Sequence, residues 1–131
     1  MGLGDQLKQF SEKTKVDLGT VVRRTALSLG ESMVKGSPVD TGRFRGAFVY
    51  GEGAQPTAQP DTPDKEGSHS LERIKVGVDG WRPGETIWIV NNLAYGPALE
   101  HGHSKQAPSG FVRISVANYQ QYIADAIASV K

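Results

Sequence analysis

The chain has 131 residues, of which 37% are hydrophobic, and this is enough apolar material for one domain with its own core. It contains no cysteine, which excludes disulfides, thiolate nucleophiles and Cys-based zinc or iron-sulfur sites. Its start lacks the basic and apolar regions of a signal peptide, and no stretch reaches the ~18 apolar residues of a membrane span. We therefore expect a single soluble domain over residues 1–131, made in a reducing cytosol and without a membrane partner.

The net charge of +1 conceals an uneven distribution of charged side chains. Residues 1–50 carry eight Lys or Arg against five acids, residues 51–85 carry four against seven, and residues 86–131 carry three against two. Neither the basic nor the acidic part is dense enough to predict tight nucleic-acid binding through counterion release. The two parts can instead attract each other, within one chain or between neighbouring subunits.

Residues 5–35 have the spacing of an amphipathic helix. The apolar positions that recur every three or four residues are Leu7, Phe10, Leu18, Val21, Val22, Leu29 and Met33. An unbroken helix of this length would measure about 45 Å, whereas a compact domain of this size has a radius of gyration of about 14 Å. We expect the helix to bend at Gly19 or Gly30, or to reach over another subunit, and to end at Gly36–Pro38.

Three later segments have the patterns of strands. Residues 43–50 alternate aromatic with other side chains, residues 74–79 alternate apolar with polar ones, and residues 87–90 form a short apolar run. The alternating apolar positions are Phe44, Phe48, Tyr50, Ile74, Val76 and Val78. Together the segments predict an antiparallel sheet of three or more strands. The aromatic face of the first strand could stack nucleic-acid bases, although core packing explains the same alternation more simply.

Residues 51–70 contain three prolines and no apolar side chain larger than alanine. Such a long segment without a pattern is uncommon in a compact domain, so we expect a flexible loop or mobile hairpin arm between strands. A passive, solvated insertion explains the composition equally well.

The last third of the chain predicts two helical segments. Pro97 can open a short turn that Gly102 closes, and Ser109 can cap a closing helix. The apolar positions of that helix are Val112, Val116, Tyr119, Ile123, Ile127 and Val130. The fold class is therefore α+β, with a long N-terminal helix and a C-terminal helix on one face of the sheet. The other face needs a partner or must tolerate water.

The sequence offers little for an enzyme. Glu100, His101 and His103 are the only cluster that could bind a metal, but no third or fourth ligand lies at a familiar spacing, and a structural polar loop is the alternative. His69 lies in the expected arm and is a poorer candidate. There is also no Gly-x-Ser-x-Gly elbow and no phosphate-binding loop. We expect no catalytic, cofactor or metal site.

Two polar motifs are not explained by packing. In the first, residues 37–45, Asp40 or Thr41 can fix a turn through its side chain and Gly42 can supply a positive φ. Arg43 and Arg45 then follow, either solvated or aimed at a carboxylate or phosphate. The second motif runs from Tyr95 to Gly102 and continues with residues 104–108. Its Glu100 is a candidate acidic partner for either arginine.

At these motifs the sequence resembles the tailed-bacteriophage family of neck and minor tail-component proteins, also called tail-completion or head-tail joining proteins. The resemblance lies in Ser-Pro-Val-Asp-Thr-Gly-Arg at 37–43, in the segment 95–102 with its Leu-Glu-x-Gly core, and in Ala-Pro then Phe-Val-Arg at 107–113. It covers most of the chain except the expected arm. The family often continues the last motif with Pro-Ala, where this chain has Ile114-Ser115.

The resemblance implies a structural virion protein at the head-tail junction, acting as tail terminator, tail-completion or neck protein. It implies a homo-oligomeric ring, hexameric or dodecameric, between the connector and the tail tube, through which DNA passes without specific binding. Such a protein would assemble in the host cytoplasm and would not be an enzyme. The candidate subunit-interface residues are Asp40, Thr41, Arg43, Arg45, Tyr95, Glu100, His101, His103 and Lys105. The alternative is a nucleic-acid-binding module that uses the basic first helix and the strand arginines.

Overall fold

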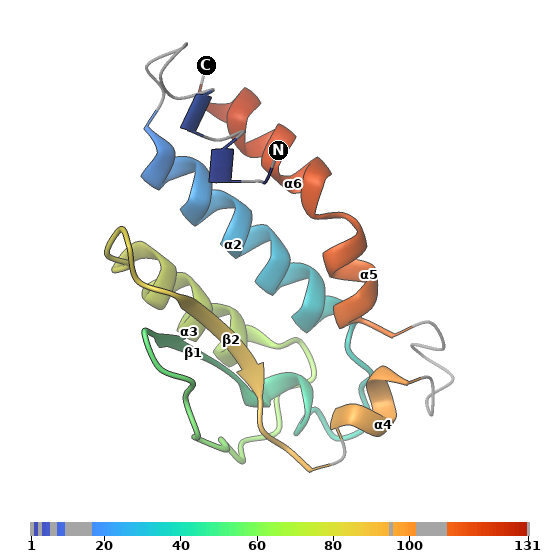
Figure 1. Cartoon of the computed structure of the whole chain (residues 1–131). Helices are drawn as coiled ribbons and strands as arrows, with labels where there is room; N and C mark the ends of the chain where they lie inside the picture. The colour runs from blue at the N-terminus through green and yellow to red at the C-terminus, as the bar shows by residue number, and fades with distance from the viewer. Residues whose placement is uncertain are drawn as a thin grey trace.

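The computed structural model describes residues 17–94, 96–101 and 110–130, together with residues 2, 4, 5, 8 and 9. Figure 1 shows three layers, in which α2 lies between α5 and α6 on one side and α3 with the sheet on the other. The prediction that the C-terminal helix lies on the sheet is therefore wrong, because this part of the chain packs on α2. In chain order the elements are α2 (Leu18–Gly36), η1 (Arg45–Ala47), β1 (Phe48–Glu52), α3 (Ser68–Asp79), β2 (Ile87–Asn91), α4 (Gly96–Glu100), α5 (Val112–Ala117) and α6 (Tyr119–Ser129).

The sheet consists of β1 and β2, which pair antiparallel with Phe48 opposite Asn91 and Glu52 opposite Ile87. The mixed α+β class is therefore confirmed, and so is the strand predicted at residues 87–90. The prediction of three or more strands is wrong for the part of the chain that the structure describes, because only these two segments form a sheet.

The segment 74–79, predicted as a strand, is the second half of helix α3. Ile74 and Val78 are four residues apart, which suits a helix as well as a strand, and both are almost fully buried. Val76, which belongs to the same face of the predicted strand, is instead 62% exposed. The helix begins where the Asp64 carboxylate accepts the backbone N–H groups of Gly67 (3.1 Å) and His69 (2.7 Å), a capping contact that short-range alternation does not reveal.

The strand predicted at residues 43–50 begins only at Phe48, because the preceding residues form a turn and the short helix η1. In the turn, Thr41 Oγ1 accepts the backbone N–H of Arg43 at 3.2 Å. Gly42 has a φ of 90°, which confirms the predicted need for glycine. The aromatic residues expected on one face of a strand therefore divide between a helical turn and β1.

Helix α2 accounts for the second half of the predicted helix 5–35. The prediction of a helix through Asp17 is wrong, because Asp17 has an extended backbone (φ −70°, ψ 106°) and the helix begins after it. It starts at Leu18 because the Asp17 side chain accepts both the backbone N–H of Gly19 and the hydroxyl of Thr20, each at 2.9 Å. Leu7 and Phe10 lie outside the described residues. Gly30 is buried in α2, and a Cβ added there would come within 2.9 Å of Ile74 on α3. It therefore permits a close helix crossing.

The segment predicted as an arm forms no hairpin. Residues 53–67 follow the surface of the domain as a loop, and residues 68–70 belong to α3. Pro56 lies against Gly51 on β1, where an added Cβ would approach it to 2.5 Å. The Asn92 side chain donates to the carbonyl oxygens of Pro56 and Ala58, each at 3.0 Å. The loop thus covers part of the sheet face that the helices leave open.

The closing helix is divided at Asn118 into α5 and α6. Ile123 on α6 is buried as predicted, whereas Val112 and Val116 are 36% and 54% exposed. The side of α5 that faces α2 carries Ser115 instead, which is fully buried. Its hydroxyl lies 2.7 Å from that of Ser32. The predicted apolar stripe is therefore correct for α6 and wrong for α5.

The crossing of α2 and α3 predicts a specific cost for a methyl group at Gly30. Gly30→Ala should lower the free energy of unfolding by about 1–3 kcal/mol, because overpacking against Ile74 outweighs the gain of about 1 kcal/mol in helix propensity. Urea denaturation measures the change. The control is Gly80→Ala, because an added Cβ there meets its nearest atom only at 3.6 Å. Equal stability of the two variants would contradict this account.

Candidate functional site

Three aromatic rings join segments that are far apart in the sequence. Phe44, Phe48 and Phe111 pack edge to face. The ring centroids are 5.5 Å apart for Phe44 and Phe111, 5.7 Å for Phe44 and Phe48, and 6.3 Å for Phe48 and Phe111. Gly96, at the start of α4, lies against the Phe44 ring, where an added Cβ would come within 3.3 Å. Phe44 directly follows the first motif of the resemblance, and Gly96 and Phe111 belong to the other two. The three motifs therefore meet at one end of the domain, which we call the motif junction (residues 37–48, 96–101 and 110–113).

A mainly apolar cavity of about 260 Å³ lies within the motif junction. Its wall contains two polar side chains among the described residues, Asn91 and Glu100. The Asn91 amide is already engaged, because Nδ2 donates to the Phe44 carbonyl oxygen at 2.8 Å. The remaining lining residues are Met33, Phe44, Phe48, Ile89, Val90, Gly96, Pro97, Phe111 and Val112.

Glu100 binds the amino end of α5. Its carboxylate accepts the backbone N–H groups of Phe111 (2.6 Å), Val112 (2.9 Å) and Arg113 (2.8 Å). Burial alone would raise the pKa of Glu100, but these three donors and the Arg113 charge outweigh it and hold the pKa below its ordinary value. The carboxylate thus fills the anion-binding position that a helix start provides.

Within one copy of the chain, Glu100 does not pair with Arg43 or Arg45. Glu100 pairs with Arg113, whose Nε lies 3.6 Å from Oε2 and whose guanidinium also donates to the Glu100 backbone carbonyl. Arg43 instead pairs with Asp61 of the surface loop, with 2.6 Å between Arg43 Nε and Asp61 Oδ1, and both side chains are largely exposed. The sequence could not show which acid lies beside which arginine, because the first contact joins two separate short helices and the second joins two loops, and both depend on the tertiary path of the chain.

Arg45 points inward and serves the fold. It donates to the backbone carbonyl oxygens of Lys35 (2.9 Å), Ser37 (2.6 Å) and Lys65 (3.1 Å). Burial lowers the pKa of Arg45, and the nearby Asp64 charge opposes this shift. The side chain therefore closes the carbonyl end of α2 and holds the loop before α3.

Asp40 and Thr41 are exposed in the turn of the first motif, where Thr41 contacts the backbone of Arg43. Gly42 is buried beneath the 53–67 loop, where an added Cβ would lie within 2.6 Å of backbone atoms of Asp64. His101 is exposed at the end of α4. Tyr95, His103 and Lys105 lie outside the described residues.

No group of three or more metal-binding side chains occurs among residues 17–94, 96–101 and 110–130. The metal hypothesis for Glu100, His101 and His103 gains no support from Glu100, since its oxygens are engaged by α5. His103 lies beyond the described part of the chain.

Two side chains of α3 that the sequence did not single out hold η1 and β1. Ser70 is fully buried. It donates to the Arg45 carbonyl oxygen at 2.6 Å and accepts the backbone N–H of Phe48 at 3.1 Å. Arg73 donates through Nε to the Phe48 carbonyl oxygen at 2.9 Å and also to that of Gly46. Burial lowers the pKa of Arg73.

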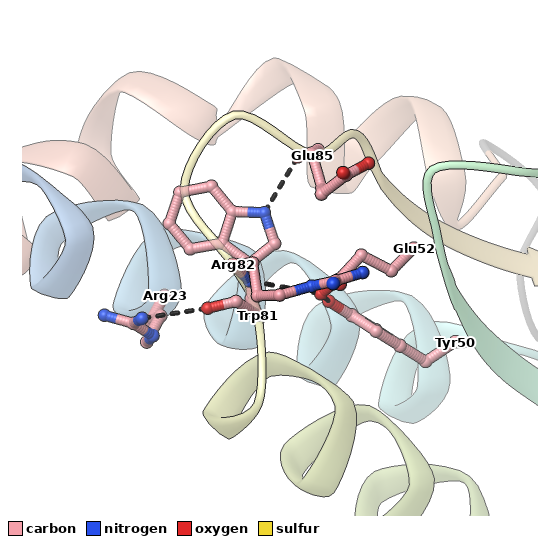
Figure 2. A network of polar contacts seen from close by, with 6 residues as sticks. All are labelled: Arg23, Tyr50, Glu52, Trp81, Arg82 and Glu85. Atoms are coloured by element: carbon pink, nitrogen blue, oxygen red, sulfur yellow. Dashed lines mark hydrogen bonds and ion pairs between the residues drawn. The ribbon is translucent and has the colours of Figure 1, made fainter.

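A second cluster lies on the turn between α3 and β2, at the opposite end of these elements from the motif junction (Figure 2). Arg23 of α2 donates to the Trp81 carbonyl oxygen at 2.9 Å, and its guanidinium lies 5.4 Å from the centre of a Trp81 ring. The indole N–H of Trp81 donates to the Glu85 carbonyl oxygen at 2.8 Å. These contacts fix the turn to α2.

The same turn is tied to β1 by an ion pair. Arg82 donates to the Glu52 carboxylate through Nε at 3.0 Å and through its backbone N–H at 3.3 Å (Figure 2). The Arg82 hydrogen bond lowers the pKa of Glu52. Burial, then the Glu52 charge, raises the pKa of Tyr50, whose hydroxyl donates to Glu52 at 3.4 Å. The cluster joins three elements and is a structural support.

Beside the motif junction, α5 exposes aliphatic side chains to solvent. Val112, Ile114 and Val116 are 36%, 47% and 54% exposed. We call these three exposed side chains together the α5 apolar face; Val112 and Val116, four residues apart, share one flank of the helix, and Ile114 lies on the other flank. Exposed aliphatic groups that gather on one short helix are typical of a protein contact surface. The helical spacing predicts Val112 and Val116 in the core and gives no signal for Ile114, so none of the three is among the predicted interface residues.

Comparison with known proteins finds no matching family model, and no curated protein or solved structure matches the chain. None of the described helices is long and apolar enough to cross a membrane.

The Glu100 cap predicts a pH-dependent loss of stability. Because the folded pKa lies below the ordinary 4.5, the cap stabilises fully above that pH and loses its effect as pH falls through the folded pKa. Glu100→Gln should lower the free energy of unfolding by about 1–2 kcal/mol at pH 7. The difference from the parent should shrink below pH 4.5. Urea titrations across pH measure it, with the exposed Glu66→Gln as control. A difference independent of pH would contradict the assignment.

Proposed function

We propose that this chain is a structural subunit of a tailed-bacteriophage virion that forms a ring at the head-tail junction. The observation that carries the proposal is the α5 apolar face, which begins at Val112 in the third motif of the resemblance, continues beyond that motif to Val116, and lies beside the motif junction. A surface of this kind suits a subunit whose contacts form on assembly. In this proposal the neighbours are further copies of the chain, the connector and the tail-tube protein.

The distribution of charge supports a ring. Closed rings need heterologous contacts, in which one patch meets a different patch on the next copy. Residues 114–130 contain a single charged side chain, Asp125. Charge depletion is a property of interface cores. The first motif instead exposes Asp40 and Arg43. We assign the core of the contact to the α5 apolar face and assign Arg43 and Asp61 to its polar rim.

The proposal changes the role of the two arginines. Arg45 is engaged by three backbone carbonyl oxygens of its own chain, so its replacement would damage the fold before any contact between copies. Arg43 is 44% exposed and pairs with an exposed acid, so it remains available to a neighbouring subunit. The near-neutral net charge of +1 suits a channel that DNA must traverse without being held.

The direct test is a pair of substitutions on the α5 apolar face. Ile114→Asp with Val116→Asp should abolish ring formation while leaving the monomer folded, because two carboxylates would have to be buried without partners at the contact. Native mass spectrometry and negative-stain imaging measure assembly, and circular dichroism measures folding.

The matched control is Val76→Asp, which places the same charge on an exposed valine of α3, away from α5. Assembly of the α5 variant into rings as readily as this control would refute the role of the α5 apolar face. A parent chain that stays monomeric at all concentrations, also with connector and tail-tube proteins present, would refute the ring itself.

A further inference from the structure

The ladder between β1 and β2 fixes the direction of every backbone group in β2. The Gly53 N–H donates to the Thr86 carbonyl oxygen at 2.8 Å, in the same register as the strands. Hydrogen-bonded pairs alternate with non-hydrogen-bonded pairs in an antiparallel ladder. Trp88 and Val90 therefore bond to β1, whereas the N–H and C=O groups of Ile87, Ile89 and Asn91 point away from it. We call these three residues the free edge of β2.

The corresponding edge of β1 is covered by α3. Phe48 directs its backbone away from β2, and there its N–H donates to Ser70 Oγ at 3.1 Å and its carbonyl oxygen accepts Arg73 Nε at 2.9 Å. Buried side chains of α3 thus replace a third strand. The outward direction of the Phe48 backbone groups is the one that the hydrogen bond between Gly53 and Thr86 requires.

The free edge of β2 has no such cover in the described part of the chain. The sheet has no strand beyond β2 there, and outside the ladder the backbone of Ile87, Ile89 and Asn91 makes no hydrogen bond to another described residue. All five residues of β2 are only half-buried. In Figure 1 the strand lies at the front of the molecule, with no helix drawn over it. Exposed edges are usually protected by a charge, a proline or a bulge, and residues 86–92 contain no charge and no proline.

We propose that the free edge of β2 pairs with the same edge of a second copy of this chain, antiparallel and about a two-fold axis. Centred on Ile89, this arrangement places Ile89 opposite Ile89 of the second copy and Ile87 opposite its Asn91. All three outward-facing residues then exchange both of their backbone hydrogen bonds. The product is a four-stranded sheet in the order β1, β2, β2, β1.

Two observations favour a second copy over another partner. Residues 86–92 carry no charge, so two copies can meet without like charges facing each other. Because α3 covers the outer edge of β1, the strand edge that each copy can offer to another chain, within the described residues, is that of β2. A contact between identical edges is necessarily two-fold and closes at two chains.

This pairing goes beyond the proposed ring and does not depend on it. Val112 lines the same cavity as Ile89 and Asn91, but Ile114 and Val116, the two residues changed in the test of the ring, do not line it, so the two contacts can be tested separately. The two-fold contact concerns the chain free in solution, where it would protect an edge that otherwise favours aggregation.

The test compares Ile87→Pro with Ile87→Ala. Both variants lose the same side chain, but proline also removes the outward N–H, and proline is tolerated at the first residue of a strand. Ile87→Pro should raise the dimer dissociation constant about tenfold relative to Ile87→Ala, because two symmetry-related hydrogen bonds are lost. Sedimentation velocity over a concentration series measures the constant, and the unfolding midpoint checks that both variants fold.

Amide hydrogen exchange gives a second readout on the parent chain. The amides of Ile89 and Asn91 should become protected as concentration rises, whereas those of Trp88 and Val90 should be protected at every concentration. Equal dissociation constants for the two variants, or exchange of Ile89 that does not depend on concentration, would overturn the proposal. The Ile114→Asp and Val116→Asp variant should still dimerise through β2, so a failure of the ring and a failure of this pairing are distinguishable.

Discussion

The fold depends on the contact among Phe44, Phe48 and Phe111, because these rings join the start of the sheet to the start of the C-terminal helices. Edge-to-face pairs of this kind contribute about 0.5–1.5 kcal/mol each beyond the area that they bury. The close approach of Gly96 to Phe44 and the Glu100 cap on α5 both require the rings to be in place. Once the motif junction has formed, the polar ends of all three motifs are fixed around one cavity.

The motif junction also determines which side chains remain exposed. Phe111 enters the core. Ser115, one helical turn later, faces α2 and bonds to Ser32. With these two residues turned inward, Val112 and Val116 lie on one flank of α5 and Ile114 on the other, and all three are exposed. The exposed aliphatic groups of α5 are thus a consequence of the same packing that buries Phe111, and a proposal of assembly through α5 follows from the position of one ring.

Local backbone conformation was predictable from the sequence where the residue types of a short segment restrict it. The positive φ at Gly42, the end of α2 before Pro38 and the apolar strand at residues 87–90 are examples. Helix α3 was not predictable in this way, since Ile74 and Val78 fit both periodicities and its cap, Asp64, lies in a segment without a pattern. Apart from the Arg113 side chain beside Glu100, the hydrogen-bond partners of Glu100 and Arg45 are backbone groups, which every residue carries, so no side-chain motif marks them. Contacts of this kind depend on the tertiary path of the chain.

The central claim is that several copies of this chain meet through α5 around the axis of a virion. An electron cryo-microscopy reconstruction of the particle that contains the chain tests it most directly. The account predicts a ring between connector and tail tube, in which Ile114 and Val116 of each copy are buried against the next subunit. A reconstruction that places the chain away from this axis, or that leaves α5 facing solvent in the ring, would contradict it.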